Sequence, residues 1–377
     1  MQAVVLVGGE GTRLRPLTLT QPKPAVRLVD RPFIRFMVDW LERHGIDEVV
    51  MACGFRAELL KQALRGRREG GAQIHYVEEE EPLGTGGPIR LAFERGLLSE
   101  RFMVLNGDVL TDLDLTQLIA SHERNDARAT LALYPVDDPT GYGLVRREGG
   151  PVEPGAAPAT LDGPVVEFLE KPPQELISTD EISAGAYVLE RDVLDLIPAG
   201  RAVSIEREVF PRLVGEGLYG QRLVGYWMDI GTPERYLQAS WDILEGRVQT
   251  EVAARLDGAG LLIDEAAAVD AAAEVSPGSL IERECEIEAA ARIGPRAVVG
   301  CASWVGAGAS VFSSVVDDHC RIGPAATVEG AILAREVQVG EGAVVAAGAV
   351  VGEGARIAAG ALVDGDARVP PGEEYTA

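Results

Sequence analysis

The chain has 377 residues, of which 46% are hydrophobic, and its formal net charge at pH 7 is −24. A chain of this length can bury a full hydrophobic core and is expected to form two or three domains. The acidic balance argues against a nucleic-acid partner, because affinity for phosphate backbones comes from clustered Lys and Arg. No apolar run approaches the roughly 20 residues of a membrane span, and the opening residues lack secretory-signal features, so we expect a cytoplasmic protein without a membrane partner.

The first part of the chain, to about residue 245, alternates short apolar runs with amphipathic segments. Apolar runs predict strands at 3–7, 48–53, 73–77, 101–105 and 129–134. Helical spacing predicts helices at 33–45, 57–66, 87–98 and 115–124. This alternation is typical of a mostly parallel sheet covered by helices, in which the ligand lies beyond the carboxyl ends of the strands. Two polar stretches follow predicted strands there, the loop GGEGTRLRP (8–16) and the pair Gly107-Asp108.

The second part of the chain is a repeat. Nineteen aliphatic residues recur every six positions from Ile263 to Val369, with slips of one before Val316 and Leu333. Six residues per side fit a triangular β-helix in which an aliphatic side chain points inward from each side. The pattern resembles the left-handed parallel β-helix of hexapeptide-repeat proteins, with a corner loop at each slip. We predict two domains, an α/β domain at 1–245 and a β-helix at 246–377, joined by a helix at 232–248.

Cysteine and histidine spacing excludes several kinds of site. The four cysteines and the four histidines are scattered, with no CxxC pair. Zinc sites, disulfide frameworks and His-based catalytic centres need such side chains in defined groups, so the sequence predicts none of them.

Positive charge gathers near the amino terminus. Six of the first 35 residues are Lys or Arg, against two acidic residues, which indicates a small anionic ligand. Glycines at 8, 9 and 11 let backbone N–H groups approach a phosphate closely, which a Cβ would block. Their spacing is neither GxGxxG nor GxxxxGK, so the loop belongs to neither a dinucleotide-binding nor a Walker motif. Lys23 and Lys171, two of only three lysines, lie beside prolines that fix the backbone around a compact cation.

The segment GGEGTRLRPLTLTQPKP (8–24) resembles the signature of nucleotide-sugar pyrophosphorylases, the sugar-1-phosphate nucleotidyltransferases. Further segments match in the family's order: EEEPLGTGGPI (79–89), LNGDVL (105–110), YGLV (142–145), VEFLEKP (166–172), ISAGAYVL (182–189), SIEREVFP (204–211) and GYWMDIGTPERYL (225–237). Several of them look most like mannose-1-phosphate guanylyltransferases. The resemblance spans both parts of the chain and implies a Rossmann-like nucleotidyltransferase domain with a mostly parallel mixed sheet, followed by the β-helix.

The resemblance implies that mannose 1-phosphate and GTP react to give GDP-mannose and pyrophosphate. The sugar phosphate is ionised at neutral pH and attacks the α-phosphorus in line, so no general base is required, and cations and Mg²⁺ carry the charge. By resemblance, Arg13 and Lys23 are the catalytic cations beside the triphosphate. The paired carboxylates that hold Mg²⁺ would be Asp108 and Asp229. The nearby Asp112 and Asp114 are interpreted as helix-start residues.

The remaining site residues also follow from the resemblance. The nucleotide would be lined by Gly8, Gly9, Gly11 and Thr12, with Leu83, Gly84 and Thr85 bordering the base and Glu81 accepting from a guanine N–H. Sugar and sugar phosphate would contact Gly143, Glu170, Lys171 and Ser183. At Ser183 the sequence departs from the Asn-Ala-Gly common in the family, which leaves the identity of the sugar open.

Three alternatives stay open on the sequence. The first is a uridylyl- or thymidylyltransferase acting on glucose 1-phosphate. The second is a regulatory subunit that binds nucleotide sugar without turnover, although the four residues of the catalytic set are present. The third adds acetyl transfer in the β-helix, where His319 is a candidate base. We expect instead that the β-helix is structural or regulatory and supports a homo-oligomer.

Overall fold

The computed structural model of the chain describes residues 1–54, 56–66 and 70–377. Its residues group into two compact units, which we describe separately. The sheet unit comprises Met1–Gly8, Met37–Glu58 and Arg65–Trp227, and the β-helix unit comprises Gly9–Phe36, Leu59–Leu64 and Met228–Ala377. These units group residues by contact, so the predicted chain boundary between 245 and 246 stays a prediction. None of the described helices combines the length and apolar character that a membrane crossing requires.

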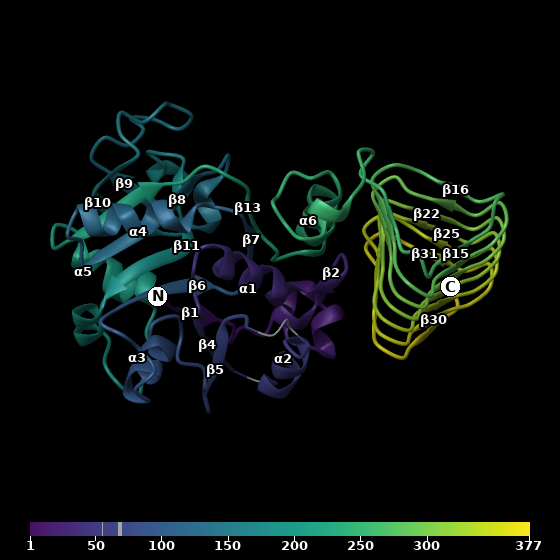
Figure 1. The fold of residues 1–377 in the computed structure, drawn as a ribbon, viewed down its shortest axis with the longest axis horizontal. Coiled ribbons are helices and arrows are strands. Elements are labelled where there is room, and N and C mark those ends of the chain that lie inside the picture. Colours follow the sequence, from purple (N-terminus) through teal and green to yellow (C-terminus); the bar gives the residue numbers. More distant parts are fainter. Residues whose placement is uncertain (55, 67–69) are drawn as a thin grey trace. The chain divides into compact units, whose positions relative to one another are not determined.

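The sheet unit is built on one mixed β-sheet (Figure 1). Its strand order is β5-β4-β1-β6-β11-β8-β12-β10-β9. The strands are β1 (Gln2–Leu6), β4 (Glu48–Cys53), β5 (Gln73–Glu78), β6 (Arg101–Asn106), β8 (Ala129–Pro135), β9 (Gly143–Arg147), β10 (Asp162–Glu170), β11 (Glu181–Glu190) and β12 (Leu218–Arg222). β1 pairs in parallel with β4 and β6, whereas β11 runs antiparallel to β6 and β8. The predicted Rossmann-like fold and the five predicted strands are therefore confirmed.

The helices of the two units form where apolar residues recur at helical spacing, and α6 belongs to the β-helix unit. The helices are α1 (Phe33–Arg43), α2 (Ala57–Ala63), α3 (Gly87–Glu94), α4 (Leu115–Arg124), α5 (Phe210–Leu213) and α6 (Pro233–Leu244), with a π-helix at Ile205–Val209. α3, the π-helix and α5 contribute to one core cluster on the sheet, around residues such as Val104, Leu131 and Tyr187. α3 ends earlier than the predicted residue 98, because Gly96 takes a φ of 72° and turns the chain out of the helix.

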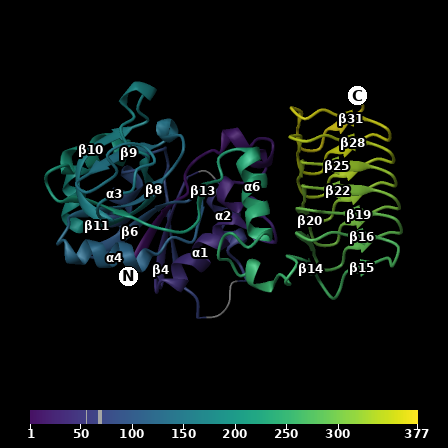
Figure 2. The same cartoon turned by 90° about the horizontal axis from the view of Figure 1, so that it is seen from above.

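The second part of the chain is the predicted left-handed parallel β-helix, and Figure 2 shows its coils stacked along one axis. Three parallel sheets form its sides over residues 262–375. The first sheet holds β14 (Leu262–Ile263), β17 (Ser279–Ile281), β20 (Ala297–Val299), β23 (Val315–Val316), β26 (Ile332–Leu333), β29 (Val350–Val351) and β32 (Arg368–Val369). The second holds β15 (Ala268–Val269), β18 (Glu286–Ile287), β21 (Trp304–Val305), β24 (Arg321–Ile322), β27 (Gln338–Val339), β30 (Arg356–Ile357) and β33 (Glu374–Tyr375). The third holds β16 (Glu274–Val275), β19 (Arg292–Ile293), β22 (Ser310–Phe312), β25 (Thr327–Glu329), β28 (Val344–Val345) and β31 (Leu362–Val363).

The register of the β-helix explains the sequence repeat and its slips. Ile281 pairs with Val299 in the next coil, and the inward aliphatic residues of successive coils form one continuous core cluster. Val299 then pairs with Val316, one residue short of a full repeat of 18. Each slip is therefore a corner turn shortened by one residue, and the second such corner contains Gly330 with a φ of 57°.

Candidate active site

The glycine loop in the β-helix unit is held by a contact that requires glycine at position 11. Gly11 has a φ of 63°, and a Cβ there would lie 3.0 Å from both Lys23 Cβ and Thr18 Cγ2. The Thr18 hydroxyl donates a hydrogen bond of 2.8 Å to the Gly11 carbonyl. The turn therefore packs directly against the segment that carries Lys23, while its contact with a phosphate stays a prediction.

Arg13 and Asp229 meet at a second glycine of the same unit. Arg13 belongs to a 3₁₀ turn at Thr12–Leu14, and Asp229 ends strand β13 (Trp227–Asp229). A Cβ on Gly231 would lie 2.9 Å from Arg13 Nη2 and 2.9 Å from Asp229 Oδ2. Arg13, the predicted phosphate cation, and Asp229, the predicted metal carboxylate, thus lie against one backbone position, although they are 216 residues apart in the sequence.

Lys23 lies in the same part of the β-helix unit. It starts a 3₁₀ turn at Lys23–Ala25, after Pro22, and borders a small apolar cavity. That cavity is also lined by Leu14 and Ile230, which directly follow Arg13 and Asp229 in the chain. The structure therefore brings three of the four predicted catalytic residues together, while their roles remain predictions.

Asp229 has a cationic partner that the sequence analysis did not single out. Arg235, in the first turns of α6, forms an ion pair with Asp229 Oδ1, and the Asp229 side chain is only 14% exposed. The backbone N–H of Arg235 donates to Thr232 Oγ1, which caps the helix. The motif GYWMDIGTPERYL contains Arg235, but the reach from the helix back to the strand end becomes visible only in the fold.

Asp108 lies in the sheet unit, at the carboxyl end of β6. The preceding residue, Gly107, donates its N–H to the Leu6 carbonyl at 2.9 Å, and a Cβ there would lie 2.5 Å from Val7 Cγ1. Asp108 thus follows a backbone that touches the end of β1, where Gly8 begins the glycine loop. Because Asp229 belongs to the other unit, the joint binding of Mg²⁺ by Asp108 and Asp229 stays a prediction.

The two neighbouring aspartates have structural partners. Asp114 caps α4, accepting from the N–H groups of Thr116 and Gln117, as predicted. Asp112 instead accepts the Tyr226 N–H at 2.6 Å, so its interpretation as a helix-start residue is wrong. The two segments are 114 residues apart, and no local pattern indicates this bond.

The segment predicted to border the base is anchored by Glu79. The Leu83 N–H donates to Glu79 Oε2 at 2.8 Å, and a Cβ on Gly8 would lie 3.0 Å from Glu79 Oε1. Burial raises the pKa of Glu79, and its bond to the Leu83 N–H partly offsets that rise. The predicted base acceptor, Glu81, is exposed. Glu79 is therefore the carboxylate that connects the first glycine with the segment 83–85.

The predicted sugar-binding residues gather where β9 and β10 pair. Gly143 is the register partner of Glu170, and a Cβ on Gly143 would lie 3.1 Å from Glu170 Oε2. Lys171 has a φ of 52°, and its Nζ lies 3.9 Å from Glu170 Oε1. Such a φ is costly for a lysine and occurs mainly where function or packing requires it. The unusual φ of Lys171 and its contact with Glu170 thus occur at the two residues that the sequence predicted to contact the sugar and its phosphate.

Ser183 stands at an irregularity of β11. The pairing of β11 with β8 shifts register between Ser183 and Tyr187, and Gly185 takes a φ of 75°. Such bulges re-aim side chains and are frequent beside active sites. Trp227, which the sequence analysis did not select, donates its indole N–H to the Ala184 carbonyl at 2.8 Å and stacks on Tyr134.

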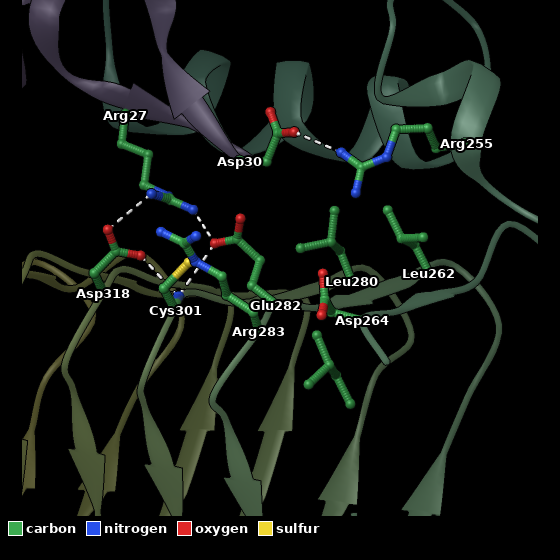
Figure 3. A pocket seen from close by; sticks show the side chains of 11 residues that line it. Arg27, Asp30, Arg255, Leu262, Asp264, Leu280, Glu282, Arg283, Cys301 and Asp318 are labelled. Atoms are coloured by element: carbon green, nitrogen blue, oxygen red, sulfur yellow. Dashed lines mark hydrogen bonds and ion pairs between the residues drawn. The ribbon is translucent and has the colours of Figure 1, made fainter. Parts of the chain in front are cut away.

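Two cations of the amino-terminal cluster are neutralised inside the β-helix unit. Arg27 contacts Glu282 and Asp318 in the corners of the coils (Figure 3), and its guanidinium also pairs with Asp317. Arg31 pairs with Asp30 and Glu251. The expectation that the whole cluster serves an anionic ligand is therefore too broad, because protein carboxylates already neutralise part of it.

Comparison with known proteins follows the same division of the chain. The sequence profile described as Nucleotidyl transferase matches residues 2–246, and the one described as GMPPB C-terminal domain matches residues 275–373. Mannose-1-phosphate guanylyltransferase of Mycobacterium tuberculosis is 38% identical over 332 residues, covering 87% of this chain and 83% of that protein. Mannose-1-phosphate guanylyltransferase 1 of Arabidopsis thaliana is 34% identical over 348 residues, covering 90% of this chain and 92% of that protein.

Solved structures resemble the first part of the chain. HddC from Yersinia pseudotuberculosis matches with a TM-score of 0.51 and 28% sequence identity, covering 63% of this chain and 97% of that chain. HddC complexed with GMP-PN matches with a TM-score of 0.50 at the same identity and coverage.

Proposed function

Since the chain belongs to the nucleotidyl transferase family, we propose that it is an enzyme that converts GTP and mannose 1-phosphate to GDP-mannose and pyrophosphate. The observation that carries this proposal is similarity along both parts of the chain, at 34–38% identity, to proteins named for this activity. The position of Arg13 and Asp229 beside Gly231 supports it, because the residues proposed as phosphate cation and metal carboxylate lie together in one unit.

The proposed reaction requires positive charge beside the phosphates and does not require a general base. A sugar phosphate oxygen attacks the α-phosphorus and pyrophosphate leaves, so two anions must meet and the leaving group must be stabilised. We assign this work to Arg13 and Lys23. Gly8, Gly9, Gly11 and Thr12 would present the backbone to the triphosphate, and the segment 83–85 would border the guanine.

Magnesium is part of the proposal, with Asp108 and Asp229 as the residues that would hold it. The fit rests on the donor set, since carboxylate oxygens together with phosphate oxygens suit a hard cation. Asp229 is mostly buried, forms an ion pair with Arg235 and lies with Arg13 beside Gly231, so its charge is held in place where the phosphates would bind. A bound Mg²⁺ would offset the negative charge of the triphosphate.

On the sugar side, the proposal assigns Glu170 and Ser183 to the hydroxyl groups and Lys171 to the phosphate of mannose 1-phosphate. Gly143 would bring the backbone against the ring, since a side chain there would meet the Glu170 carboxylate. The bulge at Ser183 supports this assignment, because it places an irregular backbone next to the predicted sugar residues.

Substrate profiling tests the proposal. Purified protein is incubated with Mg²⁺, mannose 1-phosphate or glucose 1-phosphate, and each nucleoside triphosphate in turn, and pyrophosphate release is measured. We expect release with GTP and mannose 1-phosphate. Release only with UTP or dTTP and glucose 1-phosphate would move the assignment to those transferases. Binding of GDP-mannose without any turnover would instead favour the regulatory subunit, and light scattering of the same sample tests the predicted homo-oligomer.

A further inference from the structure

Glu206 has no role in the function proposed above, although it lies in the motif SIEREVFP (204–211). The structure places it in a π-helix at Ile205–Val209, which begins after Ser204 and runs directly into α5. Helices of this kind are rare, and when they occur they are frequent at functional sites. The question is what the Glu206 carboxylate faces.

One oxygen of Glu206 is held by two hydroxyl groups. Thr85 Oγ1 donates to Glu206 Oε2 at 2.6 Å, and Ser204 Oγ donates to the same oxygen at 2.8 Å. The Ile205 N–H donates to Thr85 Oγ1 at 2.9 Å, which fixes the threonine in turn. No donor in the described part of the chain reaches Oε1, so that oxygen keeps its capacity to accept hydrogen bonds from a ligand.

Glu206 lies near the predicted sugar carboxylate, Glu170. The pKa of Glu170 is raised, first by burial and then by the negative charge of Glu206. The elements that carry the two residues pack together: Phe210, directly after the π-helix, lies edge-on to Phe168 of β10 with ring centroids 5.3 Å apart, and Glu170 ends β10 with its side chain 17% exposed. An ionised carboxylate can accept hydrogen bonds but cannot donate them. A ligand with several hydroxyl groups can donate to both Glu170 and Glu206.

A buried hydroxyl completes this group. Tyr187 is 1% exposed, and its Oη has no hydrogen-bond partner in the described part of the chain. Burial raises the pKa of Tyr187 well above its ordinary value, and the charges of Glu206 and Glu170 add to that rise. Phe210 packs edge-on against Tyr187, with ring centroids 5.2 Å apart. Tyr187 and Phe210 are both buried, so they support the site from within the core, and the two carboxylates are the groups left to accept hydrogen bonds from the hydroxyl groups of a hexose.

We infer that Glu206 is a specificity-determining residue, which together with Glu170 accepts hydrogen bonds from the hydroxyl groups of the sugar 1-phosphate. The inference rests on the function proposed above and adds a residue to its sugar site. Through Thr85, the same carboxylate is joined to the segment 83–85 that borders the base. Sugar recognition and nucleotide recognition therefore share one hydrogen bond, between Thr85 and Glu206.

The test compares mannose 1-phosphate with its single-deoxy analogues in the wild-type protein and in Glu206→Gln. The glutamine carbonyl still accepts from Thr85 and Ser204, so the fold is kept, which thermal melting verifies. We expect the KM for mannose 1-phosphate to rise roughly 10- to 100-fold, as for the loss of one hydrogen bond to a charged group. The KM for GTP stays within about two-fold, since the bonds of Thr85 are kept. Discrimination against one of the deoxy analogues should collapse, because the wild-type site rejects a ligand that leaves a carboxylate acceptor unpaired.

Glu208→Gln is the matched control. Glu208 lies two residues away in the same π-helix, and its carboxylate accepts from Arg201 and from the Ser204 N–H instead of facing Glu170. This variant should keep the wild-type discrimination. Thr85→Val is a second variant that removes the shared bond, and it should raise the KM for both substrates.

The outcomes separate this inference from the proposed function. A wild-type protein that turns over no sugar 1-phosphate with any nucleoside triphosphate removes the proposed function, and the inference with it. An active wild-type protein whose Glu206→Gln variant keeps full discrimination against every deoxy analogue overturns the inference alone. A Glu206→Gln variant that raises only the KM for GTP also overturns it, because the carboxylate would then serve the nucleotide.

Discussion

Arg27 Nη1 lies 2.9 Å from Asp318 Oδ2, so the strand that follows the turn at Lys23–Ala25 is ion-paired to a corner of the β-helix. Arg27 belongs to β2 (Arg27–Leu28), which pairs with β3 (Arg31–Pro32), and its carbonyl accepts the Tyr236 hydroxyl of α6 at 2.6 Å. Glu282 contacts the same guanidinium (Figure 3). Within the β-helix unit, one arginine thus ties the segment of Lys23 and the helix after Asp229 to the coils.

Replacing Arg27 should therefore cost far more stability than replacing an exposed arginine. The Arg27 side chain is 13% exposed, and Arg27→Met leaves Glu282, Asp317 and Asp318 as partly buried carboxylates without their cation. Breaking a buried pair from one side costs about 3–5 kcal/mol. Denaturant unfolding measures this loss.

Arg335→Met is the control for Arg27→Met in the same β-helix. Arg335 is 52% exposed and pairs with Glu336 and Glu353. Exposed pairs contribute about 0–1 kcal/mol. Equal losses for the two variants would contradict the proposed tie.

The carboxylates around Arg27 should also make stability depend on pH. Burial raises the pKa of Glu282 to about 7, although Arg27 opposes the rise, and its ordinary value is 4.5. Between these values the folded state binds more protons than the unfolded state, so the free energy of unfolding falls as pH rises from about 4.5 to 7. The slope reaches at most about 1.4 kcal/mol per pH unit for one group. Burial raises the pKa of Asp317 to about 6, which adds the same sign below that pH.

Glu282→Gln isolates this contribution. His44 and His122, whose pKa values are lowered by burial, favour folding as pH rises, but they titrate equally in both proteins. The wild-type free energy of unfolding minus that of the variant should therefore decrease between pH 5 and 8, as measured by denaturant unfolding at each pH. A difference that is constant with pH would contradict the raised pKa of Glu282.

The parts of the fold that follow local patterns could be predicted from the sequence. β1, β4 and β6 are buried parallel strands and read as short apolar runs, and the β-helix repeats an inward aliphatic residue every six positions. The strands from β9 onward are harder to predict from the sequence. β10 and β12 pair with each other antiparallel and out of chain order, and polar residues interrupt their apolar runs. Their positions depend on long-range pairing, which leaves no periodic signal.

The residues of the candidate site divide in the same way. Arg13, Lys23, Asp108 and Asp229 were predicted because they lie in motifs that resemble a family. Arg235 and Glu206 lie in quoted motifs too, but their contacts depend on the fold, since Thr85 and Glu206 are 121 residues apart. The sequence assigns Arg27 to a cationic cluster for an anionic ligand, and only its pairing with Glu282, 255 residues away, shows that it stabilises the protein itself.

Lys23 should be needed for turnover rather than for folding. It lies beside Gly11 at the start of a 3₁₀ turn, where its charge can reach the phosphates without supporting the core. Lys23→Ala should lower kcat roughly 10²- to 10³-fold, as for the loss of one preorganised charge-stabilising group. Lys61→Ala, in α2, is the control and should keep activity. Unchanged turnover in Lys23→Ala would contradict the assignment of Lys23 as a catalytic cation.

Gly231 should be as sensitive as the charged residues that flank it. An alanine Cβ at this position would lie 2.9 Å from both Arg13 Nη2 and Asp229 Oδ2, so one of the two side chains must move. A displacement of about 1 Å in a catalytic constellation can lower the rate by about 10²-fold. We expect Gly231→Ala to lose activity by that order while keeping its melting temperature, because the contacts are with side chains at the site and not with the core.

Gly258→Ala is the matched control, since a Cβ at Gly258 meets no atom within 4 Å. Steady-state kinetics and thermal melting are measured on both variants. If Gly231→Ala were as active as Gly258→Ala, then Arg13 and Asp229 would not need to stand together, and the catalytic arrangement proposed for the β-helix unit would fail. If both activity and melting temperature fell together in Gly231→Ala, the glycine would serve folding, and the same arrangement would lose its support.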